Sequence, residues 1–326
     1  MTSPRNQLLQ LLADGRFHSG ASLGQTLGIS RSAVWKHVHF LQQRQVDIHA
    51  VRGRGYRLAQ PLELLSRSSI TEQMNAEASA GLARLHLLTE VDSTNRYLLS
   101  RACHGGVSGE ACLAEYQSAG HGRQGRSWVS PFAGNIYLSL LWHFNCGAEG
   151  LGSLGLAVGV SLLRAVRSLG ATQVRLKWPN DLVSDDKKLA GILLEMNSDN
   201  RGGHFIVIGV GVNVRMPASV SGVIDQAWTD LEQVLGGPLS RNRVAAVVLQ
   251  QLVTDVALFQ SDGLYPFIDE WRRFDNLLDR PVALSVSRGT INGVARGIDE
   301  SGALRVDHDG RIQRYLAGDV TVRVSP

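Results

Sequence analysis

Apolar residues in the first 44 positions recur at helical spacing in three short segments. Leucines between Leu8 and Leu12 indicate a first helix that ends at Asp14 and Gly15. A second helix is predicted from Ser19 to Gly28, with the serine at its start and the glycine at its stop. Ser30 is a favourable N-cap for a third helix. The apolar face of that third helix consists of Val34, Val38 and Leu41.

A β-type pattern follows the third helix. Residues 46–51 and 56–58 are strand-like, and Arg52 to Gly55 form a turn between them. Three helices and a hairpin are the layout of a winged helix-turn-helix, whose third helix enters the major groove while the wing lies on phosphates. The candidate DNA contacts on these two elements are Arg31, Ser32, Trp35, Lys36, His39, Arg52 and Arg54.

The middle of the chain mixes strand and helix patterns. Residues 61–69 indicate a linker or a joining helix, and residues 151–169 a long helix that ends at Gly170. Because no regular βαβαβ repeat is visible, we expect an α+β or mixed α/β fold. The expected strands are 85–88, 111–116, 135–141, 174–178, 189–195 and 205–214.

The last fifty residues have the pattern of short strands broken by turns. Turn residues are Gly302, Asp309 with Gly310, and Gly318. This spacing predicts a small SH3-like β-barrel without an obvious catalytic set. Its expected strands are 282–286, 290–298, 303–306 and 315–324.

The composition is that of a globular protein of two or three domains: 326 residues, 44% hydrophobic and 19% charged. No uninterrupted apolar run reaches the roughly 18 residues of a membrane span, and the N-terminus does not resemble a signal peptide. Cys103, Cys112 and Cys146 form no CxxC pair, which argues against a disulfide framework and a zinc site. We therefore expect a cytoplasmic protein without a membrane partner.

Positive charge is concentrated at the N-terminus. Residues 1–60 hold eight basic and two acidic residues, whereas the whole chain has a net charge of +4. A basic module on a nearly neutral body favours a polyanionic partner, here DNA. A solvated basic helical module or a protein-docking domain remains the alternative.

A glycine loop from Gly120 to Trp128 is the strongest candidate for small-molecule chemistry. Its glycines allow backbone N–H groups to close on an anion, and its arginines offer planar cationic forks. It matches neither the Walker pattern nor the dinucleotide fingerprint. Taken alone, such a loop is more often a flexible surface turn.

Four further constellations surround this loop in the sequence. Asp92 to Asn95 is either a helix N-cap or a polar ligand cluster, and Gln117 lies between a strand end and the loop. Lys177 to Leu182 places Asp181 at a strand end, where it could hold Mg²⁺ or form an ordinary turn. Lys188 to Ile192 is either a site of close ligand approach or a solvated edge. Gly209 to Asn213 offers a slot for a flat ligand or a β-bulge.

In this order, the motifs resemble the family of bifunctional biotin–protein ligases and biotin operon repressors. The resemblance covers essentially the whole chain and implies a winged helix-turn-helix at 1–63, a catalytic domain at 64–276 and an SH3-like domain at 277–326. It implies that biotin and MgATP give biotinyl-5′-AMP and pyrophosphate. The biotinyl group then passes to a lysine of the biotin carboxyl carrier protein of acetyl-CoA carboxylase. It also implies a homodimer, promoted by biotinyl-5′-AMP, that binds operator DNA.

The resemblance also implies residue roles. Lys188 and Arg123 are the expected catalytic residues, and Asp181 is the expected Mg²⁺ ligand. The expected biotin-binding residues are Ser93, Thr94, Asn95, Gln117, Gly120, His121, Gly122, Arg123, Lys188, Gly191 and Gly209. The expected ATP- and adenylate-binding residues are Arg123, Arg126, Trp128, Lys177, Asn180, Asp181 and Asn213.

One departure concerns the loop, which in the family usually reads Gly-Arg-Gly-Arg-Arg-Gly. Here His121 and Gln124 replace two arginines, and neither offers a bidentate fork. We therefore expect weaker phosphate steering or pH-sensitive use of ATP. Two rival functions remain open at this point: a winged-helix regulator that senses a small molecule without catalysis, and a ligase for another acyl cofactor such as lipoate.

Overall fold

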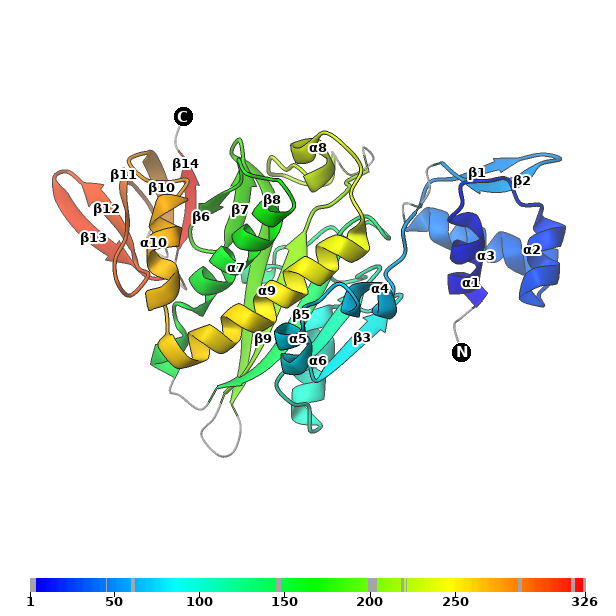
Figure 1. The fold of residues 1–326 in the computed structure, drawn as a ribbon. Coiled ribbons are helices and arrows are strands. Elements are labelled where there is room, and N and C mark those ends of the chain that lie inside the picture. Colours follow the sequence, from blue (N-terminus) through cyan, green and yellow to red (C-terminus); the bar gives the residue numbers. More distant parts are fainter. Residues whose placement is uncertain are drawn as a thin grey trace.

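The computed structural model shows three bodies in chain order: a helical domain with a hairpin, a central seven-stranded sheet with helices, and a five-stranded sheet (Figure 1). The predicted order of domains is confirmed, while the boundaries after residues 63 and 276 stay predictions. The structure describes residues 4–44, 46–59, 62–144, 148–198, 204–217, 220, 222–286, 289–317 and 320–324.

The first domain contains the three predicted helices and the hairpin. The Ser19 and Ser30 hydroxyls cap the second and third helices by accepting backbone N–H groups, and Gly28 ends the second at a φ of 65°. These local signals therefore located the helix ends correctly. The elements are α1 (Pro4–Leu12), α2 (Gly20–Leu27), α3 (Arg31–Gln43), β1 (Ile48–Val51) and β2 (Gly55–Leu58).

This first domain packs against the central domain. Phe132 and Ala133 of the central domain belong to the same apolar cluster as the buried leucines of α1. Arg44, at the end of α3, pairs with Glu90 at 2.6 Å and lies over the Phe40 ring. The predicted linker continues into two short helices, α4 (Arg67–Thr71) and α5 (Ala76–Gly81). Pro61 lies outside the described residues.

The central sheet has the order β3-β4-β5-β9-β8-β7-β6. Only β3 and β4 run parallel, which confirms that this is a mixed sheet without repeated βαβ units. The one strand of this sheet that was not predicted is β7, so Asp181 follows β6, as expected, and also opens the next strand. The strands are β3 (Arg84–Leu88), β4 (Glu110–Ala114), β5 (Ile136–Phe144), β6 (Arg175–Lys177), β7 (Asp181–Ser184), β8 (Lys187–Ser198) and β9 (His204–Val212).

Strand alternation gives the sheet two different faces. Helices α7 (Leu154–Ser168) and α9 (Arg241–Asp262) cover one face and pack on the main apolar core (Figure 1). Helix α6 (Thr94–Cys103) covers part of the other face, with a smaller apolar cluster. Gly191, Gly209 and Gly211 alternate with core residues and so lie on the α6 face. Because glycine has no side chain, other groups can approach the sheet closely on that face.

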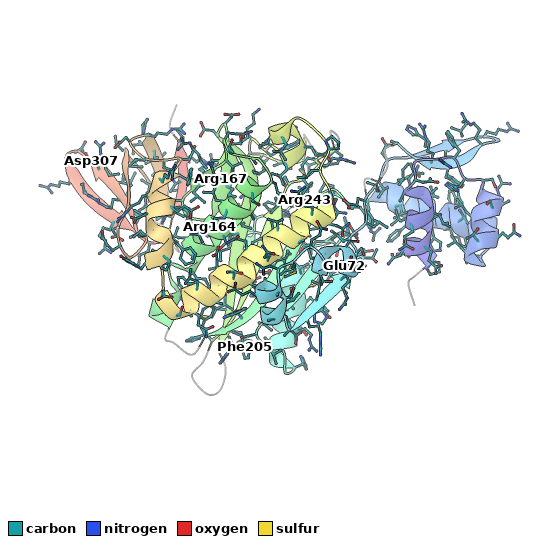
Figure 2. All side chains as sticks on the ribbon, viewed as in Figure 1. Glu72, Arg164, Arg167, Phe205, Arg243 and Asp307 are labelled. Atoms are coloured by element: carbon teal, nitrogen blue, oxygen red, sulfur yellow. The ribbon has the colours of Figure 1, made fainter. Side chains whose placement is uncertain are left out.

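Helix α9 was not predicted, although Ala245, Leu249, Leu252, Val256 and Phe259 recur at helical spacing and are buried. It has 22 residues, and an 18-residue window within it has a mean hydropathy of 1.4, enough by length and composition to cross a membrane; 56% of that window is buried inside the protein. It packs against α7. Arg164 of α7, labelled in Figure 2, pairs with Asp255 of α9 and with Glu270 of α10 (Tyr265–Arg273). It is therefore a helix of the protein core.

The C-terminal body is an antiparallel sheet of order β13-β12-β11-β10-β14. The single strand predicted over 315–324 was wrong: a turn at Asp309 and Gly310, both with positive φ, starts β13 earlier, and β14 is separate. Since β14 pairs with β10 alone within the part described, no closed SH3-like barrel is seen; Gly318 lies outside that part. The strands are β10 (Pro281–Val286), β11 (Gly289–Ile298), β12 (Leu304–His308), β13 (Arg311–Tyr315) and β14 (Thr321–Val324).

Candidate functional site

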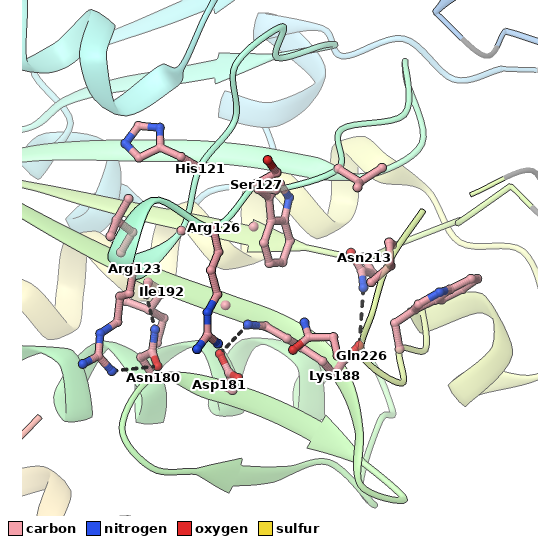
Figure 3. Close-up of a pocket in the computed structure, with 18 of the residues that line it drawn as sticks. His121, Arg123, Arg126, Ser127, Asn180, Asp181, Lys188, Ile192, Asn213 and Gln226 are labelled. Atoms are coloured by element: carbon pink, nitrogen blue, oxygen red, sulfur yellow. Dashed lines mark hydrogen bonds and ion pairs between the residues drawn. The ribbon is translucent and has the colours of Figure 1, made fainter. Parts of the chain in front are cut away.

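A cavity of about 930 Å³ lies on the α6 face of the central sheet (Figure 3). The start of α6, the glycine loop, the β6–β9 strands and β14 enclose it. It brings together every predicted ligand-binding residue except Gly120. These are Ser93, Thr94, Asn95, Gln117, His121, Gly122, Arg123, Arg126, Trp128, Lys177, Asn180, Asp181, Lys188, Gly191, Gly209 and Asn213.

One end of the cavity is built from neutral polar groups. Ser93 occupies the N-cap position of α6, but its hydroxyl makes no capping hydrogen bond. The buried Thr94 donates to Gln117 Oε1 through its backbone N–H at 2.9 Å and its hydroxyl at 3.1 Å. Ser139, fully buried on β5, lies 2.7 Å from the Thr94 hydroxyl and 2.5 Å from Asn95 Oδ1. Residues 93–95 therefore begin α6 and also supply a cluster of polar groups to the cavity.

Because Gly209 has no side chain, the side chain of another residue can occupy the neutral end of the cavity. A Cβ atom at position 209 would lie 2.2 Å from Asn95 Oδ1. The Asn95 amide therefore fills the space that the sequence assigned to a ligand slot. From there Asn95 Nδ2 donates to Glu195 of β8 at 2.7 Å.

The indole of Trp128 lies over the other two sheet glycines. A Cβ atom would lie 2.5 Å from the ring at Gly211 and 3.0 Å at Gly191. Lys188 Nζ is 5.5 Å from the centroid of the same ring, within the range of a cation–π contact. Glycines on neighbouring strands thus form a flat seat for the indole, directly beside Lys188.

The glycine loop is a tight turn. Gln124 and Gly125 have φ values of 55° and 71°, and Gly122 N–H donates to Arg126 O at 2.7 Å. Gly120 does not line the cavity, so its expected contact with biotin stays a prediction; a Cβ atom there would lie 2.8 Å from Trp128 O. Its role is to let the two arms of the loop approach each other closely.

The opposite end of the cavity is cationic. Lys188 Nζ pairs with Asp181 Oδ1 at 2.7 Å. Arg123 donates to Asn180 Oδ1 at 3.4 Å and to the Ala317 carbonyl of the C-terminal body. Burial lowers the pKa of the Lys177 ammonium. Figure 3 shows His121 on the far side of the cavity from Asp181 and Lys188.

The described residues contain no cluster of three His, Cys, Asp or Glu side chains that could hold a metal ion. Asp181 is a single carboxylate that already neutralises Lys188. A divalent cation fits here only when a ligand brings further oxygen donors. Cys103 is exposed and Cys112 is buried, and both are free thiols; Cys146 lies outside the description.

Two parts of the wall were not predicted. The backbone N–H of Lys188 donates to the Ala227 carbonyl at 2.9 Å, and the Lys188 carbonyl accepts from the Thr229 N–H at 3.0 Å. Trp228 lines the cavity from the same segment, while Val322 and Arg323 reach it from β14. No local motif marks these residues, because only the tertiary fold brings them to the site.

The predicted DNA-binding residues form an exposed basic surface. All five on α3 are exposed, with the Trp35 ring stacked on His39 at 5.4 Å, and 55% of Trp35 is accessible. Arg52 and Arg54 are exposed at the hairpin tip, with Arg54 over the Phe17 ring at 4.2 Å. The opposite face of α3 is buried as predicted.

Comparison with known proteins agrees with this architecture. The HTH domain model matches residues 4–57, the biotin/lipoate A/B protein ligase family model residues 87–213, and the biotin protein ligase C terminal domain model residues 277–323. The structure of Aquifex aeolicus biotin protein ligase in complex with biotin and ATP is 29% identical, with a TM-score of 0.63. That match covers 75% of this chain and all of the other.

Two curated relatives extend the match. A biotin–[acetyl-CoA-carboxylase] ligase of Mycobacterium tuberculosis is 32% identical and covers 81% of this chain and 97% of its own length. The bifunctional ligase/repressor BirA of Escherichia coli is 42% identical over 97% of this chain and 96% of its own. The chain belongs to the family of bifunctional biotin–protein ligases and repressors.

Proposed function

We propose that this protein activates biotin with ATP to biotinyl-5′-AMP and pyrophosphate, and then transfers the biotinyl group to one lysine of a biotin carboxyl carrier protein. The observation that carries this proposal is a single cavity with a neutral hydrogen-bonding end and a cationic end. Biotin has a neutral ureido head and an anionic carboxylate at the end of its tail. The cavity therefore matches biotin at one end and the ATP phosphates at the other.

At the neutral end, Ser93, Thr94, Asn95 and Gln117 offer donors and acceptors for the ureido group. Thr94, Asn95 and Gln117 are held by one another and by Ser139, so they are oriented before ligand arrives. Preorganisation of this kind reduces the entropic cost of binding.

At the cationic end, a carboxylate must attack the α-phosphate although both carry negative charge. Lys188 and Arg123 lower this repulsion, and Lys188 exchanges Asp181 for ligand oxygens. Arg126, Lys177, Asn180 and Asn213 serve the nucleotide, and Trp128 covers its adenine. Mg²⁺ enters as part of MgATP, with Asp181 as its protein contact. No protein nucleophile is needed, because biotin itself attacks.

Pyrophosphate release tests the ligase function. The wild-type protein with MgATP should release pyrophosphate with biotin and not with lipoate, and should then biotinylate a purified carrier domain. Release with lipoate alone would identify a lipoate-type ligase. Absence of release with either acid would identify a non-catalytic sensor.

We further propose a cytoplasmic repressor whose homodimer, promoted by biotinyl-5′-AMP, binds operator DNA through α3 and the β1–β2 wing. The exposed basic residues on both elements support this role. Random-sequence duplexes can be selected with the protein in the presence and absence of biotin and MgATP. The selected duplexes should bind more tightly with both ligands, and Arg54→Ala should weaken binding and its salt dependence. Equal affinity with and without the ligands contradicts the corepressor role.

A further inference from the structure

Glu195 is a carboxylate beside the neutral end of the cavity that the proposed mechanism does not use. It lies on β8, and its side chain is 29% exposed. Its Oε2 accepts a hydrogen bond from Asn95 Nδ2 at 2.7 Å, and both carboxylate oxygens lie 3.4 Å from His121 Nε2. One partner belongs to α6 and the other to the glycine loop.

These contacts complete a continuous series of polar side chains. From Gln117 it passes to Thr94, then through Ser139 to Asn95, and finally through Glu195 to His121. Both ends of the series, Gln117 and His121, belong to one segment and are four residues apart. The base of the glycine loop is therefore held at two points by groups from β5, β8 and α6.

The backbone is adapted to this arrangement. Asn95 reaches Glu195 across β9 only because position 209 is glycine, since a Cβ there would occupy the place of its amide. The Asn95 side chain is almost completely buried, so it depends on protein partners for its hydrogen bonds. Glu195 therefore accepts a hydrogen bond from a buried donor and also contacts the base of the glycine loop.

We propose that Glu195 is a positioning residue for the ligase: through His121 it fixes the base of the glycine loop, and through Asn95 it fixes the biotin end of the cavity. The inference rests on the proposed function and deepens it. In this chain, His121 replaces an arginine of the family's usual loop. The histidine contacts Glu195, although it offers no bidentate fork for phosphate.

Steady-state kinetics test this role. Glu195→Gln should raise the KM for biotin roughly tenfold, as expected for loss of a hydrogen bond to a charged group, with kcat and the KM for ATP almost unchanged. His121→Ala should have a similar effect, and the double variant should be no worse than either single one. His121→Arg should keep the biotin KM near the wild-type value. Glu72→Gln, at an exposed carboxylate on another surface, is the matched control.

Hydrogen exchange of the ligand-free protein gives a second measurement that does not need activity. Amides of residues 118–127 should exchange faster in Glu195→Gln than in the wild type or in Glu72→Gln, while the β5 and β9 amides stay protected. An unchanged exchange rate in the loop, or additive effects in the double variant, overturns the inference. A wild-type protein that releases no pyrophosphate contradicts the proposed function alone, because the exchange result still decides the role of Glu195.

Discussion

The two ends of the cavity differ in how their polar groups are satisfied. At the neutral end, Thr94, Asn95 and Ser139 are buried and bonded to one another. At the cationic end, Lys188 and Asp181 are each about one-fifth exposed and form a simple ion pair. A preformed network binds a rigid neutral group without rearrangement, whereas a single ion pair can open and exchange its anion for a ligand. The cavity therefore combines a fixed half with an exchangeable half.

Replacement of Lys188 should distinguish most clearly between the contributions of the two ends of the cavity. Lys188→Ala removes a cation from the reacting groups, so kcat for pyrophosphate release should fall by about 10²–10³ while biotin affinity stays close to wild type. Isothermal titration with biotin and a pyrophosphate assay give the two values. Lys187→Ala, at the exposed neighbouring residue, is the control. A large loss of biotin affinity in Lys188→Ala would show that the ends are not independent.

The glycines of β9 provide a matched pair of substitutions. Gly209→Ala places a methyl group against Asn95, and Gly211→Ala places one against the Trp128 ring. We expect the first to raise the biotin KM and the second the ATP KM, each by more than about tenfold, which is the scale of overpacking. Substrate titrations of both variants measure this. If both variants raise the same KM, the proposed division of the cavity is wrong.

Substitution of Ser139 tests whether its hydrogen bonds to Thr94 and Asn95 support biotin binding at the neutral end. Ser139→Ala leaves Thr94 and Asn95 without a shared partner, so the biotin KM should rise by about fivefold and the ATP KM should not change. Ser161→Ala is a suitable control, because Ser161 is equally buried but bonds only within α7. An equal effect of both variants on the biotin KM would indicate general destabilisation.

The smallest expected effect is on pH dependence at the cationic end. Burial lowers the pKa of Lys177, so its positive charge is lost at a lower pH than that of an exposed lysine. ATP binding should therefore weaken as the pH rises through the alkaline range, by about two- to threefold if Lys177 supplies one of several cations. Lys177→Arg keeps its charge and should flatten the alkaline part of the ATP KM profile. A profile identical to wild type would exclude Lys177 from phosphate binding.

Much of the fold was predictable where the deciding interactions are local. Ser19, Ser30 and Gly28 set the ends of the winged-helix helices within a few residues of themselves. The strand patterns of the central domain were found in the same way. By contrast, α9 packs against α7 through a regular apolar face, but apolar residues such as Val247 and Leu258 on its other side weaken the pattern in the sequence.

The candidate site shows the same division. The sequence by itself determined most of the chemistry: the glycine loop, Lys188, Asn95 and the alternating glycines all line the cavity, because their spacing on a strand or turn dictates which way they face. Only the tertiary structure decided that Asn95 packs over Gly209 and that Glu195 contacts His121. It also decided that Trp228 and Arg323 line the cavity. The first two contacts connect residues that are 114 and 74 positions apart in the sequence. Their positions depend on the packing of the whole sheet, which no local pattern encodes.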